Sequence, residues 1–242
     1  MNFFGVYQTK MQAYIITLLD DRDSRDASNR VVKSIDDTGS DLEPIIFRAT
    51  TPESLEEDMW LKLDWTFPTN ASQDRMDMAT GLYLQHYQTA DLQNRIACMV
   101  SHMRLWQKSI DLDEPIMVLE HDALFTRKFR FSDLTDGFKG GIVGLNDPRG
   151  ATRKASLFHS KVSSRMGLQP VPDLEDNYPH GLAGNSAYIV TPKGAKKVLK
   201  KVKEVGMWPN DAIMNRQFFP WMQVVYPYYT TIQRGLVSTT TS

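Results

Sequence analysis

Short apolar runs alternate along the chain with segments of helical periodicity. The runs are rich in β-forming residues and end at polar or turn-forming positions, which is typical of buried strands. They occupy residues 13–19, 44–48, 116–119, 141–145, 186–190 and 223–226. Strands that alternate with helices predict an α/β fold in which a mostly parallel central sheet carries helices on both faces.

The helices are marked by residue spacing and by their boundaries. Between Asp91 and Gln107, apolar residues recur every three or four positions, which predicts an amphipathic core helix that ends before Asp113. Thr51-Pro52 and Thr191-Pro192 each place a capping residue before a proline, as at the start of a helix. Further helices are expected over residues 22–35 and after residue 209, and irregular structure over residues 65–88.

The chain has 242 residues, a length that suits one α/β domain. We expect residues 1–10 to be a flexible leader, residues 11–237 to be the domain and residues 238–242 to be a polar tail. Residues 146–184 are polar, rich in Gly, Pro and Ser, and without sustained periodicity. A segment of this kind inside a compact domain predicts a mobile or functional loop.

Charge and cysteine content narrow the possible partners. With 28 basic and 29 acidic residues the net charge is −1, so no general attraction to nucleic acid is expected. No apolar run approaches the ~20 residues that span a bilayer, and residues 1–10 make a poor signal peptide. The single cysteine, Cys98, excludes an internal disulfide and suits a reducing compartment. These features predict a cytoplasmic protein without a transmembrane segment.

The most distinctive polar residues are Glu120, His121 and Asp122, which follow the run 116–119 directly. In open α/β sheets, ligands bind beyond the carboxyl ends of the strands. Two carboxylates at this edge suit a hard divalent ion such as Mn²⁺ or Mg²⁺, which shares its ligands with substrate phosphates and stabilises a departing diphosphate. From spacing alone, simple solvation of these acids at a strand end is an equally weighted interpretation.

For the other candidate residues, the local sequence pattern favours a structural role over a functional one. His102 lies on the core helix, where a hydrogen-bonded core histidine is more common than a catalyst. Asp211 opens a short helix and could simply cap it, although a carboxylate there could also deprotonate an acceptor hydroxyl. Four tryptophans offer faces for stacking on sugars, although aromatic residues are more often core; they are Trp60, Trp65, Trp208 and Trp221.

Three blocks in order resemble glycosyltransferase family 25, which includes bacterial lipooligosaccharide sugar transferases and collagen galactosyltransferases. The blocks are Cys98–His102 with Leu105-Trp106, then Ile116–Phe125, then Ala187–Val190 with Gly194-Ala195 and Pro209–Asp211. Weaker similarity extends to residues 15–19 and 47–49. The resemblance implies a GT-A-like fold, with the donor side at about residues 11–125 and the acceptor side at about residues 140–237.

The resemblance also implies an activity and a set of site residues. The expected reaction is inverting transfer of a sugar from a nucleotide sugar, as a UDP-hexose, to a hydroxyl of a glycan or other acceptor in lipopolysaccharide biosynthesis. Asp122 and Glu120 are the expected ligands of Mn²⁺ (or Mg²⁺), and Asp211 is the expected catalytic base. The expected donor-binding residues are Thr17, Arg25, Arg48, Ser101, His102, Glu120 and His121.

Two positions depart from the family pattern. His121 stands where the motif has an acid, and Arg95 stands where an acid precedes the cysteine helix. Both changes make the site less negative, which leaves open a catalytically silent glycan- or nucleotide-binding module with the same fold. A metal-dependent nucleotidyltransferase is disfavoured, because residues 20–26 contain no glycine for a phosphate-binding loop.

Overall fold

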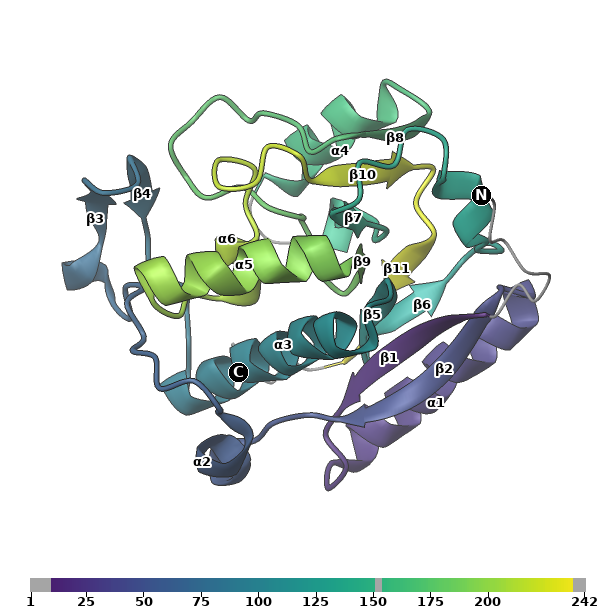
Figure 1. The fold of residues 1–242 in the computed structure, drawn as a ribbon, viewed down its shortest axis with the longest axis horizontal. Coiled ribbons are helices and arrows are strands. Elements are labelled where there is room, and N and C mark those ends of the chain that lie inside the picture. The colour runs from purple at the N-terminus through teal and green to yellow at the C-terminus, as the bar shows by residue number, and fades with distance from the viewer. Residues whose placement is uncertain (1–9, 151–153, 237–242) are drawn as a thin grey trace.

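The computed structural model describes residues 10–150 and 154–236, which form a central seven-stranded sheet with helices on both faces (Figure 1). The strand order is β2-β1-β5-β9-β7-β10-β8. These strands are β1 (Met11–Thr17), β2 (Leu42–Arg48), β5 (Ile116–Glu120), β7 (Ile142–Gly144), β8 (Gly167–Pro170), β9 (Ala187–Val190) and β10 (Gln223–Tyr226). Two small ribbons pair β3 (Arg75–Asp77) with β4 (Leu82–Leu84) and β6 (Ala123–Phe125) with β11 (Thr230–Ile232).

The sheet is mixed, and the reversal lies at its centre. Strands β1, β2, β5, β7 and β10 run in one direction, whereas β9 and β8 run in the other. The predicted α/β class is therefore confirmed, with most strands codirectional but β9 antiparallel to both of its neighbours. The apolar runs could not show this, because an apolar run reports burial on both faces and carries no information on strand direction.

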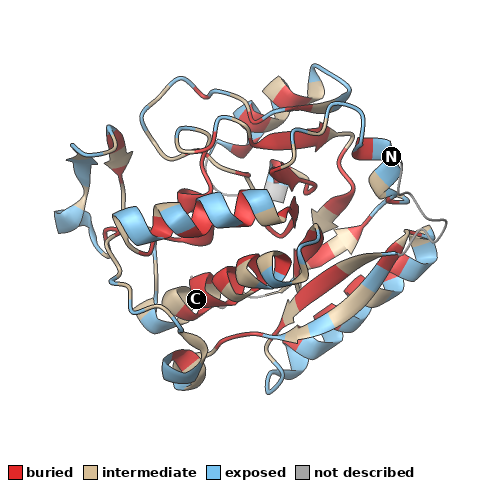
Figure 2. Ribbon diagram, in the orientation of Figure 1, coloured by how far each residue is buried: buried red, intermediate tan, exposed pale blue. Residues whose placement is uncertain are grey.

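The helices are α1 (Arg22–Thr38), α2 (Leu55–Asp58), α3 (Leu92–Leu112), α4 (Ala155–Ser163), α5 (Pro192–Val205) and α6 (Asn210–Ile213). Short 3-10 turns are η1 (Pro52–Ser54), η2 (Ala71–Gln73), η3 (Phe131–Leu134) and η4 (Pro148–Gly150). One buried cluster joins the sheet to α3 and α5, and a second joins it to α1. Figure 2 shows the buried positions concentrated on the strands and on the inner faces of these helices.

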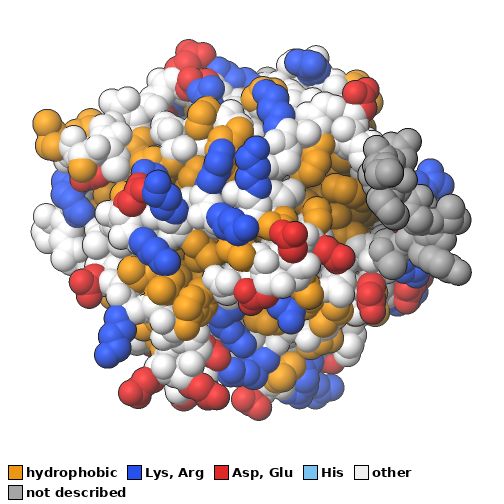
Figure 3. Space-filling model, viewed as in Figure 1, with side chains coloured by type: hydrophobic (Ala, Val, Ile, Leu, Met, Phe, Trp, Pro, Cys, Tyr) orange, Lys and Arg blue, Asp and Glu red, His pale blue; other side chains and the backbone are white. Residues whose placement is uncertain are grey.

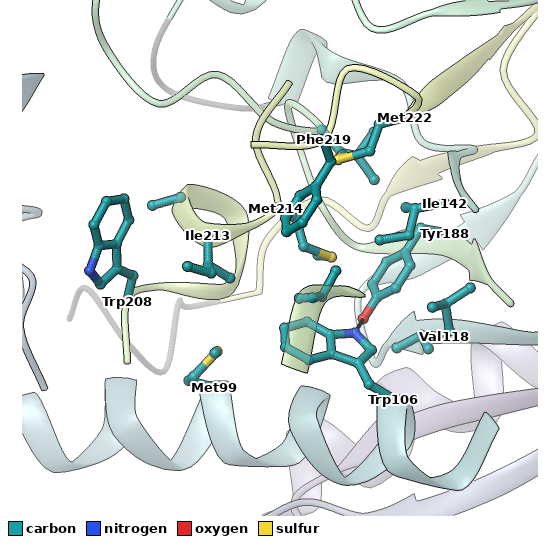
Figure 4. Close-up of a cluster of buried hydrophobic side chains, with 14 of the residues drawn as sticks. Met99, Trp106, Val118, Ile142, Tyr188, Trp208, Ile213, Met214, Phe219 and Met222 are labelled. Carbon is teal, nitrogen blue, oxygen red and sulfur yellow. Dashed lines mark hydrogen bonds between the residues drawn. The ribbon is translucent and has the colours of Figure 1, made fainter. Parts of the chain in front are cut away.

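The long helix α3 is the element that shapes the site. It begins where Asp91 caps the backbone N–H of Gln93, and it ends where Asp113 adopts a left-handed conformation. Its inner face is fully buried, including Met99 and Trp106. Figure 4 shows the Trp106 indole directed at the Tyr188 hydroxyl of β9, so α3 is anchored to the centre of the sheet by a hydrogen bond as well as by packing.

Helix α5 covers the same face beside α3 and presents its basic side outward. The Thr191 side chain caps the N–H of Gly194, as the sequence predicts. A side chain at Gly194 would meet the Gly141 carbonyl oxygen at 2.8 Å, so glycine allows the helix to start against the sheet. Figure 3 shows lysine side chains spread across this outer face.

The segment 146–184 is more regular than the sequence suggests. It contains η4, helix α4 and strand β8, which pairs antiparallel with β10 at the sheet edge. Helix α4 buries only Ala155, Phe158 and Val162, a pattern too short to establish a periodicity. The interpretation as an irregular loop is therefore wrong, whereas its movement remains a prediction. Residues 151–153, most of the expected leader and the expected tail lie outside the described residues.

None of the helices within residues 10–150 and 154–236 combines the length and the apolar character that crossing a bilayer requires.

Candidate active site

A pocket opens where β2, β1 and β5 end, and the first half of α3 closes it. The strand side is formed by Ile16 and Leu18, by residues 49–52 and by Glu120 and His121. The helix side is formed by Asn94, Ala97, Cys98, Ser101 and His102. The pocket lies beyond the carboxyl ends of parallel strands, which is the position at which α/β sheets bind ligands.

The acidic motif splits between the two faces of the sheet, because successive side chains of a strand point in opposite directions. Glu120 faces α3, where its carboxylate lies 3.3 Å from Nε2 of His102. His121 faces α1, where its Nδ1 lies 3.1 Å from the Ser24 hydroxyl. Burial lowers the pKa of His121, so its ring is neutral near pH 7. Both Glu120 and His121 nevertheless line the pocket.

Asp122 carries a carboxylate oxygen with no protein partner. Its Oδ1 is buried and accepts no hydrogen bond in the described part of the chain. Burial and, to a smaller extent, the nearby charge of Glu120 raise the pKa of Asp122 to about 7, although a hydrogen bond from Ser186 acts in the opposite direction. A buried, unpaired carboxylate oxygen is costly unless a ligand completes it. Asp122 and Glu120 together therefore fit the oxygen ligands of a hard divalent ion.

A buried hydrogen-bond relay orients Glu120. The Trp106 indole N–H donates to the Tyr188 hydroxyl at 2.8 Å, and this hydroxyl lies 2.9 Å from Nδ1 of His102. Burial raises the pKa of Tyr188, so the hydroxyl keeps its proton near pH 7. Nε2 of His102 faces both Glu120, at 3.3 Å, and the side-chain amide of Asn210, at 3.0 Å. His102 is thus a core histidine, as local pattern favours, and also part of the site.

Asp211 lies in the first turn of α6 and joins the two other carboxylates electrostatically. Burial raises the pKa of Asp211, the Arg95 guanidinium lowers it, and the charge of Glu120 raises it. Asn210, the preceding residue, places its side-chain amide 3.0 Å from Nε2 of His102. The structure therefore brings Asp211 towards Glu120 from the opposite side of the sheet's edge.

The Cys98 thiol lies among these groups. Its sulfur, a ring nitrogen of His102 and a carboxylate oxygen of Glu120 all lie within 4.8 Å of one another. Burial raises the pKa of Cys98, and the negative charges of Glu120, Asp211 and Asp122 add to the effect. The thiol is therefore protonated near pH 7, which favours the carboxylates over Cys98 as ligands of a cation.

Two further predicted donor-binding residues, Ser101 and Thr17, differ in whether their side chains face the pocket. Ser101 lines it and accepts a hydrogen bond from the backbone N–H of Thr50 at 2.9 Å. Thr17 is turned away, because its buried hydroxyl lies 2.7 Å from that of Ser28 on α1. The structure thus supports a place at the pocket for Ser101 and none for the Thr17 side chain.

The two predicted donor-side arginines have protein partners. Arg25 lies exposed in the first turn of α1 and donates to the Leu19 carbonyl. Arg48 forms an ion pair with Asp58, with its Nη2 at 2.7 Å from the carboxylate. Neither side chain lines the pocket. For Arg48 the reason is the acidic partner supplied by α2, which the sequence pattern did not reveal.

Two site residues were missed from the sequence. Asp58 has only 5% of its side chain exposed and accepts hydrogen bonds from Thr50, Ser54 and Arg104 at 2.9, 2.9 and 3.1 Å. It therefore fixes the pocket rim at residues 49–54. Asn185 precedes Ser186 at the entrance to β9, and both polar atoms of its buried amide lack a protein partner. Neither residue belongs to a recognisable local motif.

Residues 10–136 match glycosyltransferase family 25 (LPS biosynthesis protein), whereas no curated protein matches the chain. A solved structure of the galactosyltransferase LgtC with donor and acceptor sugar analogs is 11% identical, with a TM-score of 0.41, over 88% of this chain and 73% of LgtC. An active-site mutant of LgtC is 9% identical, with a TM-score of 0.45, over 94% and 89%.

The LgtC likenesses are too distant to assign a substrate or a residue. The family match, in contrast, covers more than half of the chain, since it spans 127 of 242 residues. It includes β1, β2, α3 and β5, the elements that form the walls of the pocket. The chain belongs to glycosyltransferase family 25.

Proposed function

We propose that this glycosyltransferase inverts the anomeric centre of a UDP-hexose while transferring the sugar, with assistance from Mn²⁺ or Mg²⁺, to a hydroxyl of a glycan or other acceptor. The observation that carries the proposal is that Glu120 lines the pocket and that its charge acts on two further carboxylates, those of Asp122 and Asp211. Mutual repulsion makes such a cluster unfavourable in the isolated protein, so a cation and a proton-bearing substrate are the ligands that suit it.

The donor side of the reaction belongs to the pocket under α3. Asp122 and Glu120 would hold the cation, which when bound supplies positive charge that stabilises the departing diphosphate. The relay through Tyr188 and His102 fixes the Glu120 carboxylate, so that its second oxygen can orient a donor hydroxyl. The rim at residues 49–54 excludes water from one side of the bound nucleotide.

The acceptor side belongs to Asp211. Its carboxylate would accept the proton of the acceptor hydroxyl while that oxygen forms a bond to the anomeric carbon. The bond from the anomeric carbon to the diphosphate breaks on the opposite face, and UDP leaves with the electron pair. Burial raises the pKa of Asp211, which makes its carboxylate a stronger base than an exposed aspartate.

The deciding experiment measures UDP release from a panel of UDP-sugars, with and without Mn²⁺, for the native chain and for Asp122→Asn. Hydrolysis of the donor needs no acceptor, so the unknown acceptor does not limit the assay. We expect Mn²⁺-stimulated release by the native chain and a loss of about 100-fold in Asp122→Asn. Asp136→Asn, at an exposed turn, is the matched control and keeps the native rate. Equal rates for all three proteins would refute the role of Asp122.

A silent nucleotide-binding module is the second candidate, because His121 replaces an acid of the motif. The replacement leaves the carboxylates of Glu120 and Asp122 in place, which weakens this alternative. Titration calorimetry separates the two candidates. Metal-strengthened UDP binding together with slow donor hydrolysis supports the enzyme, whereas UDP binding without any hydrolysis supports the silent module.

A further inference from the structure

A second cavity lies on the other side of the first turn of α3. Asn94 lines the donor pocket, and the next residue, Arg95, lines this second cavity. The cavity has a volume of about 210 Å³, which is room for several water molecules and hence for a sugar ring. Its walls come from the segment 65–69 and from residues 87–95.

The lining combines aromatic faces with polar groups. Trp65, Phe67 and Tyr87 form the aromatic part, and the rings of Phe67 and Tyr87 meet edge to face at 5.3 Å. Thr69 and Thr89 add hydroxyl groups. Sugar rings bind to surfaces of this kind, because their C–H faces pack on aromatic rings while their hydroxyls need hydrogen-bond partners.

The Trp65 indole supplies an unused donor. Its Nε1 is buried and has no hydrogen-bond partner within the described residues. A buried N–H without an acceptor is unfavourable, and indole groups usually find a partner when they are buried. The other buried indoles differ in this respect, since Trp106 donates to Tyr188 and Trp208 donates to the Thr66 hydroxyl. A hydroxyl of a bound ligand would accept a hydrogen bond from the Trp65 indole N–H.

Arg95 supplies a polar group to the lining of the second cavity and is held by several contacts. Its Nε donates to the Thr89 hydroxyl at 2.8 Å, its Nη2 donates to the Gln88 carbonyl at 3.1 Å, and its guanidinium lies over the Tyr87 ring at 5.2 Å. These contacts hold the guanidinium in one place. A fixed donor group orients a ligand at little entropic cost.

The backbone ties this cavity to the proposed catalytic base. The N–H of Thr66 donates to the Met207 carbonyl at 3.1 Å, and the N–H of Met207 donates to the Asp64 carbonyl at 2.8 Å. Met207 lies four residues before Asp211. Consequently, the aromatic wall and the start of α6 form one unit, and the positive charge of Arg95 acts on Asp211.

We propose that the cavity bounded by Trp65, Tyr87 and Arg95 is the acceptor subsite, and that it holds a sugar ring against its aromatic wall. The inference rests on the proposed transfer reaction, because an acceptor subsite has meaning only beside a donor site. It commits the acceptor to a carbohydrate, whereas the donor pocket alone would accommodate transfer to any hydroxyl compound.

The test combines indole NMR spectra with two matched variants. The native chain, saturated with UDP and Mn²⁺, is titrated with methyl β-D-galactopyranoside, methyl β-D-glucopyranoside and lactose, with glycerol as a control polyol. We expect the Trp65 indole N–H resonance to shift with at least one sugar, while that of Trp106 stays in place. Trp65→Phe should weaken the binding of that sugar about tenfold, through loss of the indole hydrogen bond and stacking area.

Measurement of donor hydrolysis without sugar distinguishes a failure of the acceptor subsite from a failure of the proposed function. Trp65→Phe should retain UDP release in the absence of sugar within about twofold, and should lose the extra release that the sugar stimulates. Trp60→Phe, at a tryptophan that is 43% exposed, should match the native chain in both measurements.

If the protein hydrolyses a UDP-sugar but no sugar of the panel shifts the Trp65 resonance, the acceptor subsite is overturned and the proposed function remains intact. Equal shifts with glycerol, or equal sugar affinity in Trp65→Phe, would overturn it as well. Sugar binding at Trp65 without any donor hydrolysis would instead refute the proposed function.

Discussion

Single buried residues near the pocket carry polar atoms that lack partners in the part of the chain that the structure describes. Asp122 is the clearest case, since its Oδ1 is one such atom, and burial together with the charge of Glu120 raises its pKa to about 7. Asn185 is a second case, because neither polar atom of its buried amide has a partner among those residues. Polar groups of this kind are uncommon in cores and concentrate at functional positions.

We predict that Asp122→Asn stabilises the chain in the absence of metal. The pKa of Asp122 is raised from 3.8 to about 7, so the folded state binds a proton more tightly and its stability falls as the pH rises through this range. Asparagine removes this penalty, and unfolding by urea at about pH 8 should show a gain of about 2–4 kcal/mol. At about pH 4 the gain should vanish, because the native carboxyl is then protonated as well.

Asp136→Asn, at an exposed turn, is the control and should change stability little at either pH. A stability of Asp122→Asn that equals the native value at both pH values would contradict the assignment of Asp122 as a buried, unpaired carboxylate.

At the scale of elements, three parts of the fold meet through one buried relay. Trp106 and His102 come from α3, Tyr188 comes from β9 and Glu120 comes from β5. His102 contacts both the Tyr188 hydroxyl and Glu120, so packing between a helix and two strands positions a side chain beside a carboxylate in the pocket. Loss of this relay should therefore lower the rate of donor hydrolysis.

Tyr188→Phe tests this dependence. The variant leaves the buried Trp106 N–H and Nδ1 of His102 without their shared partner, which should lower the free energy of unfolding by about 1–3 kcal/mol. We also expect kcat/KM for donor hydrolysis to fall about tenfold and its pH profile to change, because Nδ1 of His102 loses its hydrogen-bond partner. Tyr14→Phe, which removes a hydroxyl bonded only to Gln12 in β1, is the control and should leave the pH profile unchanged.

A second element-scale device is the anchoring of the pocket rim by Asp58. Burial by itself raises the pKa of Asp58, but hydrogen bonds from Thr50 and Ser54 and the charges of Arg104 and Arg48 outweigh it and leave the pKa below its usual value. The anchor therefore contributes stability above about pH 4, and this contribution is lost as the pH falls through the lowered pKa.

Asp58→Asn should loosen the rim at residues 49–54. We expect an affinity for UDP about tenfold lower by calorimetry and a stability loss of about 1–2 kcal/mol near pH 7 that diminishes as the pH falls through the lowered pKa of Asp58. Asp37→Asn removes an exposed ion pair with Lys33 and serves as the control, with both quantities close to native. Native UDP affinity in Asp58→Asn would show that the rim does not contact the nucleotide.

At the scale of the whole molecule, the pocket is formed by the same elements that hold the fold together. The pocket draws its walls from β1, β2, β5 and α3, which belong to the central sheet and its main helix. A ligand that binds only the folded state stabilises the entire domain. UDP with Mn²⁺ should therefore protect the fold and not merely the loops around it.

We predict that UDP and Mn²⁺, at about 100 times their dissociation constant, raise the free energy of unfolding by about 2.7 kcal/mol, which is about 5–10 °C in Tm for a domain of this size. Scanning calorimetry of the native chain and of Asp122→Asn provides the measurement. The variant should lose the part of the shift that depends on Mn²⁺. A metal-dependent shift of native size in the variant would place the cation elsewhere.

Much of this arrangement was predictable from the sequence, and the exceptions have a common physical origin. Apolar runs located the strands of the central sheet except β8, and polar residues at strand ends, together with the family resemblance, located Glu120, Asp122 and Asp211. The anchor at Asp58 was not predictable, because its partner Arg104 is 46 residues away along the chain. Burial of Thr17 against Ser28 depends likewise on how α1 docks.

The reversed direction of β9 has a consequence for how the enzyme can diversify. Because β9 is antiparallel to β5, the chain enters β9 at the same edge where β5 leaves the sheet, and the Glu120 N–H donates to the Ser186 carbonyl at 2.8 Å. The connection that precedes Asn185 and Ser186 thus opens onto the reaction centre, whereas α5 departs from the far edge. Insertions and exchanges in that connection can reshape substrate choice while every strand of the sheet keeps its register.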